Sequence, residues 1–138
     1  MKWGQQILII CICTFCKWVE AGIIVDRRSS TVARWVHAEI TCRYGTPRLI
    51  RTDRGTEFRG AFSRYLADMG VRHTLILPQH PRANGMVEQY NGIILSGLRR
   101  MSAAVPGAPV QDLLPEVLAG LRFLLRRVGF QPYLLAFK

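Results

Sequence analysis

Short apolar runs that alternate with polar turns predict four strands along the chain. The first run, Ile7–Ile12, is rich in β-branched residues and is bounded by a polar turn near Thr14–Cys16, after which Lys17–Val25 predicts a second strand and completes a hairpin. Two further strands are predicted at Arg48–Thr52 and Val71–Leu77. The pattern therefore places a hairpin first and two separate strands later.

Apolar residues spaced three or four positions apart predict helices between and after these strands. The predicted helices cover Thr31–Tyr44, Glu57–Met69, Met86–Ala103 and Asp112–Arg127. A loop is predicted over Pro78–Gly85 and a short terminal element over Gln131–Phe137. The order of strands and helices predicts an α/β domain with a mixed sheet, and the length of 138 residues fits a single domain over residues 1–138.

The chain is strongly basic. Nineteen Lys and Arg residues against nine Asp and Glu give a net charge of +10, and 16 of the 19 bases are arginine. Arginine grips phosphate through two parallel hydrogen bonds, which favours a nucleic-acid partner. Net charge that serves solubility alone is the alternative at this point.

The cysteines and the first apolar run bear on the compartment. Cys13 and Cys16 form a C-x-x-C pair without a second pair, which favours reduced thiols over a zinc site and points to an intracellular protein. The run Ile7–Cys16 is too short to cross a bilayer, so no membrane association is expected. A signal peptide is a weaker alternative, because Lys17 follows the run without a cleavage pattern of small residues.

Among the nine carboxylates, Asp53 and Glu88 are candidates for metal binding. Asp53 follows a strand and precedes Gly55, and Glu88 is expected in the first turn of a long helix, so both could meet at one sheet edge. Oxygen ligands of this kind select Mg²⁺ or Mn²⁺. The alternative is that Asp53 caps a turn and Glu88 caps the helix. Glu57 is expected to complement a helix dipole, and the remaining carboxylates, Glu20 among them, are expected to be solvated.

Two motifs resemble the retroviral and gypsy-type retrotransposon integrase core. Arg51–Phe58 (RTDRGTEF) is similar to the family pattern (S/T)-D-x-G-x-x-F, and His80–Asn91 (HPRANGMVEQYN) is similar to H-P-x-x-N-G-x-V-E-x-x-N. Phe15–Ala21, Arg43–Pro47 and Gln131–Leu135 are similar to three further family segments. The resemblance covers nearly the whole chain in order, and it implies a ribonuclease-H-like fold, with a mixed sheet flanked by helices, and DNA strand-transfer chemistry.

The chain also departs from the family pattern. The family's first catalytic carboxylate lies in a W-x-x-D-x-T strand, the central strand of its sheet, whereas here Trp3 is followed by Gly4-Gln5-Gln6 and no carboxylate precedes Glu20. The domain is therefore expected to be incomplete at its N-terminus and to lack that strand. The 34 residues between Asp53 and Glu88 are one fewer than is usual in the family.

By resemblance, Asp53 and Glu88 are the catalytic and metal-binding residues, and Mg²⁺ or Mn²⁺ is the cofactor. The residues expected to contact nucleic acid are Arg51, Arg54, Arg59, His80, Arg82, Asn84 and Asn91. We expect non-specific binding of DNA through its phosphates, a nuclear location, and a homodimer as in the family. Because three carboxylates normally hold two metal ions, we expect the chain to be catalytically inactive. A non-catalytic DNA- or protein-binding module retained by a host is the alternative function, and a small secreted or membrane-anchored protein is a weaker one.

Overall fold

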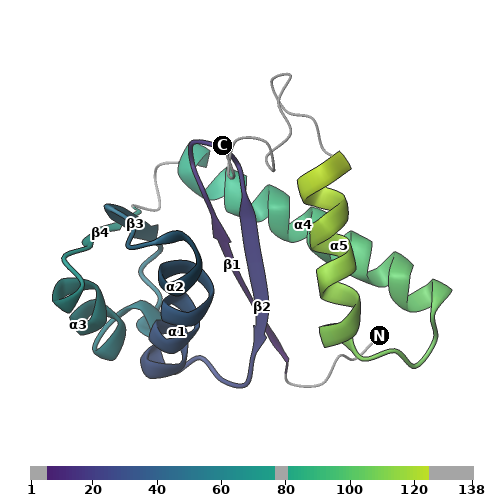
Figure 1. The fold of residues 1–138 in the computed structure, drawn as a ribbon, viewed down its shortest axis with the longest axis horizontal. Helices are drawn as coiled ribbons and strands as arrows, with labels where there is room; N and C mark the ends of the chain where they lie inside the picture. The colour runs from purple at the N-terminus through teal and green to yellow at the C-terminus, as the bar shows by residue number, and fades with distance from the viewer. Residues whose placement is uncertain (1–5, 77–80, 125–138) are drawn as a thin grey trace. The chain divides into compact units, whose positions relative to one another are not determined.

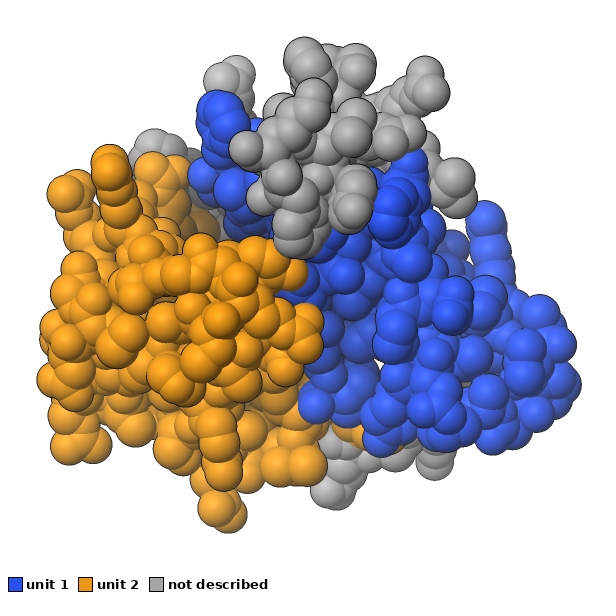
Figure 2. Space-filling view, in the orientation of Figure 1, with its two compact units in different colours: residues 1–3, 8–23, 86–138 blue, residues 4–7, 24–85 orange. Residues whose placement is uncertain are grey.

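A computed structural model describes residues 6–76 and 81–124, except for the side chains of residues 81–84 and 124. The chain divides into two compact units, and each is described by itself (Figures 1 and 2). Unit 1 comprises residues 1–3, 8–23 and 86–138, and unit 2 comprises residues 4–7 and 24–85. Unit 1 therefore joins segments that are distant in the sequence.

Unit 1 is built from a hairpin and two helices. Strands β1 (Ile7–Ile12) and β2 (Val19–Ile24) pair with each other, and helices α4 (Pro81–Ala104) and α5 (Val110–Leu124) complete the unit (Figure 1). The strands were predicted correctly, because their apolar runs and the polar turn between them are unambiguous.

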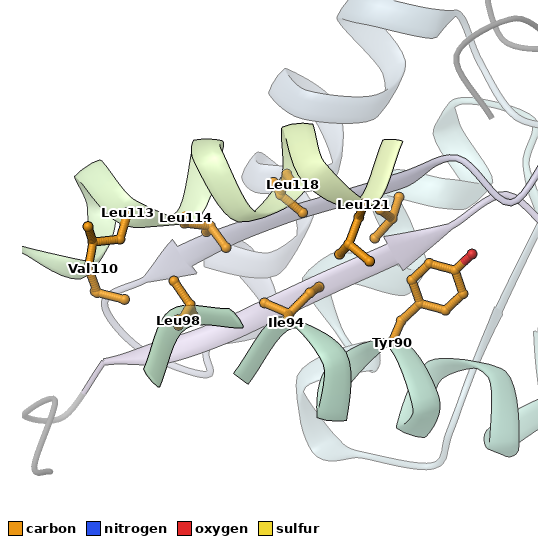
Figure 3. Packing of buried hydrophobic residues seen from close by; sticks show 9 residues of the cluster. Tyr90, Ile94, Leu98, Val110, Leu113, Leu114, Leu118 and Leu121 are labelled. Atoms are coloured by element: carbon orange, nitrogen blue, oxygen red, sulfur yellow. The ribbon is translucent and has the colours of Figure 1, made fainter. Parts of the chain in front are cut away.

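The core of unit 1 lies where α4 and α5 meet the hairpin. In Figure 3 the side chains of Tyr90, Ile94 and Leu98, spaced at i, i+4 and i+8 on α4, face those of α5. Ile94 is completely buried. The residues of α5 in this cluster are Val110, Leu113, Leu114, Leu118 and Leu121. Burial of this apolar surface is the main force that holds the two helices together.

Unit 2 holds a second set of short elements. A helix runs through α1 (Ser29–Val36), a π-helical turn (His37–Thr41) and α2 (Cys42–Tyr44), and it ends at Gly45, whose φ of 85° suits glycine. Strand β3 (Leu49–Thr52) pairs in parallel with β4 (Arg72–Leu75), and helix α3 (Ala61–Asp68) lies between them in the sequence. The buried residues of this unit include Val32, Val36, Phe62, Leu66 and Val71.

Two predicted elements differ in the structure. The helix expected over Glu57–Met69 is a 3₁₀ turn at Thr56–Phe58 followed by α3, because Gly60 adopts a φ of 58° and interrupts the helix. The loop expected over Pro78–Gly85 is wrong for Pro81–Gly85, which is already helical. Proline suits the first position of a helix, and five further residues therefore join α4.

The single mixed sheet is replaced by two pairs of strands in the part of the chain that the structure describes. One sheet contains β1 and β2, and the other contains β3 and β4. The last predicted element, Gln131–Phe137, and the end of the helix predicted to reach Arg127 lie outside the described residues.

Two glycines of α4 offer a matched test of the helix packing. A Cβ added to Gly97 would lie 2.8 Å from Cγ1 of Val117 on α5, whereas a Cβ added to Gly92 would meet nothing within 4 Å. We expect Gly97→Ala to lower the free energy of unfolding by about 1 kcal/mol, because overpacking outweighs the gain in helix propensity. Gly92→Ala should raise it by about 0.5–1 kcal/mol. Denaturant unfolding followed by circular dichroism measures both, and equal stabilisation by the two substitutions would contradict the close approach of α5.

Candidate functional site

Asp53 lies directly after β3, where a buried threonine anchors the strand. Thr52 Oγ1 lies 2.8 Å from His73 Nε2 of β4 and 2.9 Å from the Asp53 carbonyl oxygen, to which it donates. The Asp53 side chain is exposed, and its Oδ1 accepts a hydrogen bond of 2.8 Å from the Gly55 N–H. Asp53 therefore caps a turn, as one alternative proposed, and its position is set by the two paired strands.

A second carboxylate lies beside this turn. A Cβ placed on Gly55 would lie 2.5 Å from Glu57 Oε2 and 3.0 Å from Asp53 Oδ1, so both carboxylates flank the same glycine. A side chain at position 55 would displace them. The absence of a side chain on Gly55 thus allows two negative groups to gather at the end of β3.

Arginines surround the same turn. Arg51, Arg54 and Arg59 are all exposed. The Arg59 guanidinium donates from Nη2 to the Arg54 carbonyl oxygen at 3.2 Å, which folds its side chain back over the turn. The end of β3 therefore presents cations and carboxylates together, which suits a phosphate bound through a metal or directly.

Glu88 lies on α4, seven residues after that helix begins. The prediction that it occupies the first turn is wrong, because α4 starts at Pro81, and Glu88 therefore does not cap the helix. Glu88 and Asn91 are both exposed, while Tyr90 and Ile94 point into the core. An exposed carboxylate in mid-helix remains available to a ligand.

The structure leaves some predicted residues undescribed or unplaced. His80 lies outside the described residues, as do the side chains of Arg82 and Asn84. Asp53 belongs to unit 2 and Glu88 to unit 1. Their convergence therefore stays a prediction.

Glu20 was expected to be solvated, and that prediction is wrong. Its side chain is 5% exposed, and its Oε2 pairs with Nη2 of Arg122 at 2.6 Å. Its Oε1 accepts a hydrogen bond of 2.9 Å from the indole N–H of Trp18. Arg122 also donates to the Val19 carbonyl oxygen and lies 4.5 Å from the centre of the Trp18 ring. No sequence pattern indicates the partner of Glu20, since Arg122 lies about a hundred positions further along the chain.

Within residues 6–76 and 81–124, no group of three or more His, Cys, Asp or Glu side chains is arranged to hold a metal ion. No helix in these ranges is long and apolar enough to cross a membrane.

Comparison with known proteins gives related sequences over almost the whole chain. The chain is 30% identical over 133 residues to the Gag-Pol polyproteins of gibbon ape leukemia virus and koala retrovirus. These residues are 96% of this chain and 8% of each polyprotein, so the chain spans a small part of these relatives. No protein-family model matches the chain.

Solved structures of integrases share the fold. The chain superposes on the integrase of a simian T-cell lymphotropic virus intasome, in complex with PP2A regulatory subunit B56 gamma, with a TM-score of 0.85 and 26% identity over 96% of this chain and 49% of that one. For the catalytic core domain of BIV integrase the TM-score is 0.82 at 22% identity, over 99% of this chain and 88% of that domain. The chain belongs to the retroviral integrase catalytic cores.

The integrase relationship confirms the ribonuclease-H-like α/β fold expected from the two motifs. The catalytic core domain of HTLV-2 integrase, solved in complex with magnesium, matches with a TM-score of 0.78 at 22% identity over 95% of this chain and 84% of that domain. The magnesium is a property of that structure.

Two residues near Asp53 were missed or misjudged from the sequence of this integrase core. Glu57 was expected to serve a helix dipole, although its spacing of four from Asp53 across a glycine could have indicated a shared turn. His73 was not singled out. The parallel pairing places Thr52 opposite Leu75, and His73 lies two residues before Leu75 on β4.

The partial burial of His73 makes stability depend on pH. Burial lowers the pKa of His73 from its ordinary 6.5, so the folded protein favours the neutral ring. Below pH 6.5 the unfolded chain binds a proton that the folded chain does not, and the free energy of unfolding should fall as the pH decreases through the folded pKa. Urea unfolding of the wild type and His73→Gln between pH 8 and 5 measures this effect. The variant should lose part of the pH dependence, and an NMR titration of His73 with a pKa above 6.5 would contradict the expectation.

Proposed function

We propose that the chain is an integrase core that binds DNA non-specifically through its phosphates and does not join DNA ends by itself. The observation that carries the proposal is the end of β3, where Asp53 is held in a turn among three exposed arginines. The net charge of +10 supports the same partner. The relationship to integrase cores supplies the class of reaction.

The proposal assigns metal binding to Asp53 and Glu88. Asp53 Oδ1 already accepts a hydrogen bond from Gly55, and the second carboxylate oxygen is the expected ligand. The donor set consists of carboxylate oxygens and fits Mg²⁺ or Mn²⁺. When bound, such an ion would lower the pKa of a water or hydroxyl group and stabilise the leaving oxygen of a phosphodiester.

Loss of catalysis follows from the number of carboxylates. Two ions at one site repel each other unless enough negative charge lies between them, and the family uses three carboxylates for this purpose. Glu20 is the first carboxylate of the chain, and Trp18 and Arg122 already engage both of its oxygens. We therefore propose one weakly held ion and no measurable turnover.

The proposal includes a nuclear location and self-association into a homodimer, both by relationship to the integrase cores. The run that a signal peptide would require contains β1, which pairs with β2 in the folded domain. This pairing favours a strand of the folded domain over a cleaved signal peptide for that run. Fractionation of cells that express the tagged chain tests the location.

Binding to duplex DNA should depend steeply on salt. The logarithm of the binding constant should fall with that of the salt concentration by roughly 0.9 for each phosphate neutralised. Each of Arg51→Gln, Arg54→Gln and Arg59→Gln should reduce this slope by about 1. Arg43→Gln is the matched control, since it changes the net charge equally but removes an arginine paired with Glu39 at 2.8 Å. Fluorescence anisotropy measures the slopes, and equal slopes for all four variants would contradict the assigned surface.

The activity prediction compares the chain with an extended form. The 138-residue chain should give no strand transfer or disintegration product in Mg²⁺ or Mn²⁺. An N-terminal segment that carries the W-x-x-D-x-T strand should restore activity by supplying the third carboxylate and the central strand.

Restored activity should require both remaining carboxylates. Asp53→Asn or Glu88→Gln in the extended form should abolish it, whereas Asp112→Asn, an exposed carboxylate on α5, should not. Metal-dependent joining by the chain without the segment would overturn the inactive assignment. DNA binding without joining by the extended form would favour a non-catalytic module.

A further inference from the structure

The turn between β1 and β2 brings two cysteines together. The Cys13 N–H donates to the Trp18 carbonyl oxygen at 2.8 Å, and the Lys17 N–H donates to the Cys13 carbonyl oxygen at 3.0 Å. Lys17 adopts a φ of 63°, which turns the chain sharply into β2. Cys16 directly precedes Lys17 and is therefore held beside Cys13 at the tip of the hairpin.

The two thiols interact, and the tip is open to solvent. The Cys13 and Cys16 side chains lie close enough for each to change the pKa of the other. Cys13 is exposed, Cys16 is half-buried, and Phe15 between them is 86% exposed. A small reagent can therefore reach Cys13, and the second sulfur lies within reach of the first.

The environment favours Cys13 as the attacking thiol. Partial burial raises the pKa of Cys13, but hydrogen bonds from Cys16 and Phe15 and the charge of Lys17 outweigh burial and bring it below its ordinary 9.0. Burial raises the pKa of Cys16, and the interaction with the Cys13 side chain raises it further. One thiol of the pair thus ionises before the other, as thiol–disulfide exchange requires.

We propose that Cys13 and Cys16 form a dithiol site that exchanges with low-molecular-weight disulfides of the glutathione type and closes reversibly into an intramolecular disulfide. The Cys13 thiol gives its proton to water, and its thiolate attacks one sulfur of the small disulfide. The S–S bond of the reagent breaks, and one small thiolate leaves and takes a proton from solvent. The Cys16 thiol then gives its proton to water, and its thiolate attacks the Cys13 sulfur and expels the second small thiolate, which is protonated by solvent. Two S–H bonds and one S–S bond become one protein disulfide and two small thiols.

The other two cysteines lack this combination. Burial raises the pKa of Cys11 to about 11, which keeps its thiol protonated at neutral pH. Cys42 is exposed, but its sulfur lies in unit 2 near Nε2 of His37, at 3.5 Å, and its sequence neighbours include no second cysteine. These residues therefore provide internal controls.

The test treats the 138-residue chain carrying Cys42→Ser with oxidised glutathione at pH 7.5 and measures its mass without reductant. The protein should lose two hydrogen atoms, retain no glutathionyl group, and give a peptide in which Cys13 is joined to Cys16. In the parent chain that also carries Cys16→Ser, one glutathionyl group should remain on Cys13. Addition of Cys13→Ser should slow the reaction about tenfold, and Cys11→Ser should behave like the parent.

Circular dichroism before oxidation shows whether each serine variant is folded, and the mass of the parent tests the proposal without any of them. A glutathionyl group that persists on the parent would overturn the proposal. A disulfide that contains Cys11, or an unchanged rate in Cys13→Ser, would overturn it as well. DNA binding is not used as a readout, so these outcomes are independent of the proposed function.

Discussion

A buried carboxylate on β2 requires a cation from a distant helix, and unit 1 depends on that requirement. Glu20 would be costly to bury alone, because an ion without its hydration needs a partner of opposite charge. Arg122 meets the need at 2.6 Å and also binds the Val19 carbonyl oxygen and covers the Trp18 ring. Apolar side chains along α4 and α5 could pack in neighbouring registers, whereas this network selects one position of α5 against β2.

The same network limits the chemistry of the chain. A carboxylate enclosed between an indole N–H and a guanidinium serves the fold, and moving it toward a metal would leave Arg122 buried without its partner. The exposed carboxylates are of another kind. Asp53 is held by backbone and strand contacts alone, and Glu88 extends from the outer face of a helix whose inner face carries the core. Structural and ligand-binding carboxylates are thus separated by burial.

The sequence predicted those elements whose signals are local. The strands β1 and β2, the strands β3 and β4, and the turn at Asp53 all follow from short patterns. The start of α4 at Pro81 did not, because Asn84-Gly85 is a sequence signal for a turn. The burial of Glu20 depends on a residue far along the chain, and the proximity of Glu57 to Asp53 depends on the 3₁₀ turn ahead of Gly60. No sequence spacing reveals the contact of Glu20 with Arg122.

The π-helical turn at His37–Thr41 has a consequence for how length varies in this family. A π-helical turn contains one residue more than an α-helical turn, and the helix continues at Cys42 after it. Thr41 and His37 in this turn both contact the Tyr65 hydroxyl, so α3 packs against the widened part. Gain or loss of a single codon here would therefore be absorbed inside the helix, with both of its ends and the turn at Gly45 left in place. An aligned relative with a gap at these positions would still contain the whole helix.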